Sequence, residues 1–132
     1  MAFTSPALAS TTQSILRIFD PSGLVKTEVT NDGVVRSSVR AVRQTDASGS
    51  LIGTFTKVGA AKFCSLTRAL ARRGTRLGRP QHFAFEVAGR IYTRPWADYK
   101  AFPNGLCGSP GFEVGGMRLT VARSLARLIR GG

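Results

Sequence analysis

The chain has 132 residues and a formal net charge of +12, because nineteen lysine and arginine residues outnumber seven aspartate and glutamate residues. This length fits one domain with a buried core, and a hydrophobic content of 42% excludes an intrinsically disordered chain. The charge indicates either an anionic partner or a basic surface that contacts only solvent.

The first half of the chain predicts short strands separated by turns. Residues 1–12 are small and polar, and we expect them to form a flexible N-terminus. Residues 14–19 alternate as a strand does, and residues 24–29 follow a Pro-Ser-Gly turn as the hairpin partner. Residues 34–43 fit a helix or a strand, and their arginines have helical spacing. Residues 51–55 predict a further short strand.

A first amphipathic helix is expected over residues 58–73, ending at Gly74. Apolar residues in this segment repeat with helical spacing, and its basic residues lie on the other side. Residues 82–87 and 90–94 then predict two strands joined by an Ala-Gly turn. Because Pro95 removes a backbone donor, the second strand ends there or lies at a sheet edge.

The C-terminal part predicts a long loop over residues 96–111, a short strand, and a second amphipathic helix over residues 118–130. The order of elements indicates an α+β fold in residues 13–132: a mostly antiparallel sheet with both amphipathic helices packed on one face.

The two cysteines are too few for a disulfide scaffold. Cys64 falls at the edge of the apolar helix face, where a packed free thiol is the default, and Cys107 lies in a glycine-rich loop. A single disulfide between them is the alternative. A metal site is not expected, because His82 is the only histidine and no Cys-x-x-Cys spacing exists.

Four motifs follow one another along the chain. The first is a strand that ends in Thr54-Phe55-Thr56, followed by a helix with Gly59-Ala60, Phe63 and Leu66-Thr67. The second is the pair of strands that ends at Pro95. The third is a loop motif made of Asp98, Tyr99, Pro103, Asn104, Gly105 and Gly108. The fourth is a closing helix marked by Ala122, Leu125, Ala126, Ile129 and Gly132.

In this order and spacing, residues 30–132 resemble the head of the first large extracytoplasmic domain of SecD, a membrane protein that assists Sec-dependent protein export. The resemblance implies the SecD-head fold and contact with polypeptide. The chain departs from the family at Ala88, where the family has a turn Asp, and at Arg118, where it has a helix-capping Thr. SecD's transmembrane helices have no counterpart here, so proton-driven translocation is not implied.

The long loop contains the candidate polypeptide contacts Trp96, Tyr99 and Phe102. These rings either form an exposed hydrophobic clamp or fold back to attach the loop to the sheet. The sequence alone favours the second arrangement, since long ordered loops usually carry a small core of their own.

The basic residues of the two helices are the candidate contacts to an anionic partner. If both helices cover one sheet face, their outer sides form a continuous positive surface that suits phosphate groups. The candidates are Lys57, Lys62, Arg68, Arg72, Arg73, Arg76, Arg79, Arg123, Arg127 and Arg130.

Two functions follow from these patterns. The first is a non-enzymatic SecD-head-like module that contacts polypeptide, and the second is a basic adaptor or assembly protein on nucleic acid or another anionic surface. We expect no enzyme and no cofactor, since no catalytic constellation can be assembled. The expected location is extracytoplasmic if the chain is part of a SecD-type protein. It is cytoplasmic if the chain stands alone, because residues 1–10 lack a secretory signal.

Overall fold

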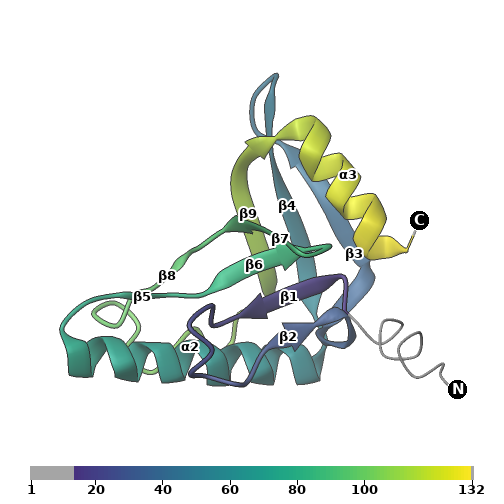
Figure 1. Cartoon of the computed structure of the whole chain (residues 1–132). Helices are drawn as coiled ribbons and strands as arrows, with labels where there is room; N and C mark the ends of the chain where they lie inside the picture. Colours follow the sequence, from purple (N-terminus) through teal and green to yellow (C-terminus); the bar gives the residue numbers. More distant parts are fainter. Residues whose placement is uncertain (1–13, 132) are drawn as a thin grey trace, which may run out of the picture.

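The computed structural model describes residues 14–131 of the chain (Figure 1). The predicted flexible N-terminus, residues 1–12, lies outside the described residues. Within residues 14–131, the α+β class, with antiparallel strands and two amphipathic helices, is confirmed. The elements are β1 (Leu16–Phe19), β2 (Val29–Thr30), the 3-10 helix η1 (Asn31–Gly33), β3 (Val34–Arg43), β4 (Ser48–Phe55), α2 (Lys57–Leu77), β5 (Gln81–His82), β6 (Ala84–Val87), β7 (Arg90–Thr93), β8 (Trp96–Ala97), β9 (Gly111–Arg118) and α3 (Leu119–Arg130).

In the described part of the chain, the strands form three antiparallel sheets, with strand orders β2-β1-β6-β7, β3-β4-β9 and β5-β8. Helix α2 lies against η1, β2, β5, β8 and β4, whereas α3 lies against β3, β4 and β9 (Figure 1). The prediction that both helices share one face of one sheet is therefore wrong. The reason is connectivity: α3 follows β9 directly and packs on the sheet of β9, while α2 crosses from β4 to β5.

One hydrophobic core joins the layers. Phe63, Leu66 and Leu70 of α2 are buried in it, as are Leu125 and Ile129 of α3. The ring centroids of Phe55 and Phe63 lie 5.0 Å apart, and Phe83 meets Phe63 edge to face at 5.6 Å. These contacts connect α2 to the sheets of β4 and β6.

Helix α2 is longer than predicted. Thr56 caps its start, since the threonine hydroxyl accepts the Gly59 N–H at 3.0 Å. The expected stop at Gly74 is wrong: the helix continues to Leu77 and ends at Gly78, whose φ of 72° is the left-handed conformation typical of a helix C-terminus. Gly74 lies inside the helix, where a Cβ would approach the Tyr99 ring to 2.9 Å, so a glycine at this position lets Tyr99 pack against α2.

The ambiguous segment 34–43 is strand β3, paired with β4 and interrupted by a register shift between Val35 and Arg40. In the segment 24–29, only Val29 belongs to a strand and pairs with β1. The chain before it is instead organised by the Asp20 carboxylate, which accepts the backbone N–H groups of Ser22 and Val25.

Candidate functional site

The long loop runs beside the C-terminal half of α2 (Figure 1). Apolar side chains are exposed there. Trp96 is 57% exposed, Phe102 is 51% exposed, and Leu77 at the end of α2 is 49% exposed. Tyr99 is half-buried, because its ring packs over Gly74. We call Leu77, Trp96, Tyr99 and Phe102 the aromatic tip. Of the three predicted contacts, only Tyr99 folds back.

The exposed Trp96 ring has a defined support. Strand β8 pairs with β5, which places Trp96 opposite His82 and Ala97 opposite Gln81. The rings of His82 and Trp96 stack with centroids 3.5 Å apart, and Nδ1 of His82 lies 2.7 Å from the Arg94 carbonyl oxygen. Because Ala97 is buried and strand side chains alternate, Trp96 is directed outward on an ordered strand.

A compact turn presents Phe102. One oxygen of the Asp98 carboxylate accepts the backbone N–H groups of Lys100 at 3.0 Å and Ala101 at 3.3 Å. The Asp98 carbonyl accepts the Phe102 N–H at 2.8 Å, and the Phe102 carbonyl accepts the Gly105 N–H at 3.0 Å. These bonds within the turn leave the Phe102 ring in solvent.

The other end of the loop is fastened to α2 covalently and by hydrogen bonds. The Thr67 hydroxyl accepts the Leu106 N–H at 2.8 Å, and Nε of Arg68 donates to the Asn104 carbonyl at 3.2 Å. Cys64 and Cys107 form a disulfide with their Cα atoms 4.4 Å apart. The default of a free thiol at Cys64 is therefore wrong, because the turn brings Cys107 onto the helix. Arg68, a predicted contact to an anionic partner, already donates a hydrogen bond to this loop.

Two concave features accompany the loop. A groove of about 380 Å³ lies on the outside, lined by Gly78, Pro80, Trp96, Asp98, Tyr99 and Lys100. An apolar cavity of about 210 Å³ lies on the inside of the loop. Its lining includes Phe63, Phe83, Phe85, Pro95, Leu106 and Phe112. The tip thus combines exposed rings with a groove large enough for a side chain.

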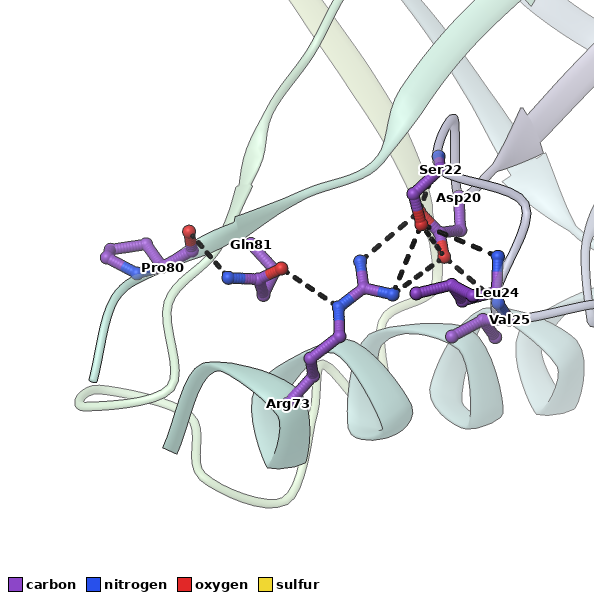
Figure 2. Close-up of polar contacts among 7 residues, drawn as sticks. All are labelled: Asp20, Ser22, Leu24, Val25, Arg73, Pro80 and Gln81. Carbon is purple, nitrogen blue, oxygen red and sulfur yellow. Dashed lines mark hydrogen bonds and ion pairs between the residues drawn. The ribbon is translucent and has the colours of Figure 1, made fainter. Parts of the chain in front are cut away.

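Arg73 is buried and binds Asp20 (Figure 2). Its guanidinium donates to the two carboxylate oxygens at 3.0 and 3.3 Å and to Oε1 of Gln81 at 2.9 Å. Gln81 in turn donates to the carbonyls of Arg79 and Pro80. The network therefore positions the segment that leads from α2 into β5 and supports the groove.

The Asp20 carboxylate is stabilised in its charged form. Burial alone raises the pKa of Asp20, but the hydrogen bond from Arg73 and the N–H groups of Val25 and Ser22 outweigh it, so this pKa lies well below its usual range. The prediction that Arg73 contacts an anionic partner is wrong, because its charge is already paired inside the protein. The apolar stripe of α2 did not reveal this, since Arg73 borders it.

The remaining basic candidates do not form one surface, because α3 covers the sheet of β3, β4 and β9, whereas α2 lies mainly against η1, β2, β5 and β8 (Figure 1). Lys57, Lys62, Arg72, Arg76 and Arg79 are exposed along and just after α2. Arg123 and Arg127 are exposed on α3, whereas Arg130 donates to the Val39 carbonyl and Arg36 donates to the Ile129 carbonyl. The adaptor hypothesis loses the continuous surface on which it depended.

Sequence reasoning missed two members of the site. Leu77 was missed because the helix was ended at Gly74, and His82 because no local pattern shows a ring stacked on Trp96. The pairing of β5 with β8 brings the two rings together across an intervening hairpin. The extra helical turn had a signal, since Gly78 followed by Pro80 is also a common way to end a helix.

No protein-family model and no curated protein matches the chain. A solved structure does match: that of "a membrane component SecDF that enhances protein export", with a TM-score of 0.61 and 18% identity. The match covers 97% of this chain and 67% of that chain. The chain therefore shares the fold of the matched part of that structure. The resemblance to SecD inferred from the motifs is confirmed as a likeness of fold.

Two further observations bear on the kind of site. Among residues 14–131, no helix has the length and apolar character needed to cross a membrane. Within the same part of the chain, His, Cys, Asp and Glu side chains do not gather into a cluster that could hold a metal ion.

Proposed function

We propose that the chain is a non-enzymatic, SecD-head-like module that contacts extended polypeptide and takes part in protein export. The observation that carries this proposal is the aromatic tip: two exposed rings held on an ordered strand and turn beside a groove, on a fold shared with an export component. Exposed aromatic residues with fixed positions typically mark protein contacts.

Three features suit polypeptide as the partner. Trp96 and Phe102 offer exposed apolar surface to an extended chain. The groove, which Trp96 and Gly78 both line, is large enough for one side chain. Tyr99, packed on Gly74, forms part of the groove wall. Because the tip is already ordered by hydrogen bonds and a disulfide, binding requires little further ordering of the protein.

The test is binding of the whole chain to a labelled unstructured peptide that contains Phe and Leu, followed by fluorescence anisotropy. We expect Trp96→Ala/Phe102→Ala to weaken binding at least about tenfold, as is usual for central aromatic contacts. The matched control is Val58→Ala/Leu128→Ala, which removes exposed apolar side chains away from the tip. Equal affinity of the tip variant and the control variant would refute the proposed site.

A further inference from the structure

The aromatic tip is surrounded by positive charge. Arg72 and Arg76 are exposed on the last turns of α2, and Arg79 stands between Gly78 and Pro80, which both line the groove. Lys100 lines the groove itself, and its Nζ lies 6.0 Å from the centre of the Tyr99 ring.

Within the described part of the chain, no carboxylate forms an ion pair with these basic side chains. Among residues 14–131, the ion pairs between side chains involve only Arg17 and Arg73 on the basic side. The one carboxylate at the groove is Asp98, and one of its oxygens already accepts two backbone N–H groups of the turn. Any partner in the groove therefore meets a net positive field.

We propose that the tip selects polypeptide segments in which apolar residues stand next to aspartate or glutamate. The inference rests on the proposed polypeptide contact and adds the chemistry of the segment it takes. The apolar side chain of such a segment meets Trp96 and Phe102, and its carboxylates meet Arg76, Arg79 and Lys100. Segments with lysine or arginine at the same places are repelled.

A peptide fits these observations better than nucleic acid. At most one face of the Trp96 ring is open to a stacked base, because the His82 ring contacts the other at a centroid distance of 3.5 Å. Exposed Phe102 and Leu77 add apolar surface that a phosphate backbone does not use. Arginine and lysine around an apolar centre are instead the arrangement that steers and orients a charged peptide.

The experiment uses three peptides with the same Phe and Leu residues, in which the intervening positions are Asp/Glu, Ser/Gln or Lys/Arg. Trp96 is the only tryptophan of the chain, so its fluorescence reports binding at the tip directly. We expect the acidic peptide to bind roughly tenfold more tightly than the basic one at low salt. The difference should shrink at about 0.3 M salt, where exposed charges are screened.

Charge reversal locates the effect. Arg76→Glu/Arg79→Glu is expected to abolish the preference for the acidic peptide. The matched control Arg123→Glu/Arg127→Glu, which changes the net charge equally on α3, is expected to keep it. An equal loss in both variants would show that only net charge acts, and would overturn the inference.

The remaining outcomes separate the two proposals. Equal binding of the acidic, neutral and basic peptides overturns charge selection and leaves the polypeptide contact standing. Failure of every peptide to bind overturns the polypeptide contact and the selection together. Tighter binding of an anionic lipid vesicle or an oligonucleotide, lost in Arg76→Glu/Arg79→Glu, overturns the peptide as the occupant.

Discussion

Removing the Asp20 carboxylate is expected to destabilise the domain strongly. The side chain of Asp20 is 1% exposed and that of Arg73 is 10% exposed, so the pair is almost fully out of water. Asp20→Ala leaves the Arg73 guanidinium buried without a counter-charge, which typically costs about 3–5 kcal/mol. A domain of this size is usually stable by about 5–15 kcal/mol, so the loss is a large share of the total.

The two partners should not be equivalent. Without Arg73, the Asp20 carboxylate still accepts the N–H groups of Ser22 and Val25 at 3.0 Å and the Ser22 hydroxyl at 2.8 Å. Without Asp20, the guanidinium retains only Gln81 and the Ser22 hydroxyl. Arg73→Met, which keeps most of the aliphatic stem, is therefore expected to cost less than Asp20→Ala. The double variant should cost less than the sum, because neither charge is then left alone.

The assay is urea unfolding of the disulfide-bonded chain, followed by circular dichroism and Trp96 fluorescence. Arg72→Met is the matched control, since Arg72 precedes the buried arginine on α2 but is exposed. Its stability is expected to stay close to that of the parent chain. An Asp20→Ala variant as stable as this control would refute the reasoning about the buried pair.

The same pair predicts the sign of a pH effect. The folded state holds the pKa of Asp20 below its usual range, so as pH falls the unfolded chain binds this proton first, near its ordinary pKa of about 3.9. The contribution is fully present above about pH 5 and is lost as pH falls further. The stability gap between the parent chain and Asp20→Asn should therefore narrow on acidification. A constant gap from about pH 7 to pH 3 would contradict the assignment.

Three further predictions concern the backbone and the disulfide. Ala88 has a φ of 52°, so Ala88→Asn is expected to raise the free energy of unfolding by about 0.5–1.5 kcal/mol in urea unfolding; no gain would contradict this. Cys64→Ser/Cys107→Ser removes a disulfide that joins residues 43 positions apart in the sequence. It should lower the free energy of unfolding by up to about 4 kcal/mol, and an unchanged melting temperature would contradict this. Gly59→Ala places a methyl group against the Gly33 carbonyl and should lower the yield of folded protein; normal folding would show that η1 can move.

Much of the fold was accessible from local patterns. The apolar spacing of Phe63, Leu66 and Leu70 predicted α2, and that of Leu125 and Ile129 predicted α3, because helix periodicity is written directly into the chain. Segment 34–43 stayed ambiguous, since its residues fit a helix or a strand and its arginines have helical spacing. Its pairing with β4 decided the outcome, and such pairing is a contact between strands that a local pattern does not contain.

The sequence identified the aromatic residues of the site, but it did not show which of their side chains are exposed. Trp96, Tyr99 and Phe102 could be found because aromatic residues in a Pro- and Gly-rich loop are unusual, yet only the structure separates the two exposed rings from the one that packs on Gly74. Arg73 could not be told from its exposed neighbour Arg72. Its burial depends on a carboxylate 53 residues away in the sequence.

The linear chain by itself settled the helix periodicity, the strong positive charge and the ordered series of motifs, all of which depend on neighbours within a few residues. Folding in three dimensions decided which strands each helix packs against, which arginine is paired with a carboxylate, and that the two cysteines form a disulfide. Those outcomes depend on strand pairing and loop closure between distant segments. Their free energy appears only when the whole core assembles.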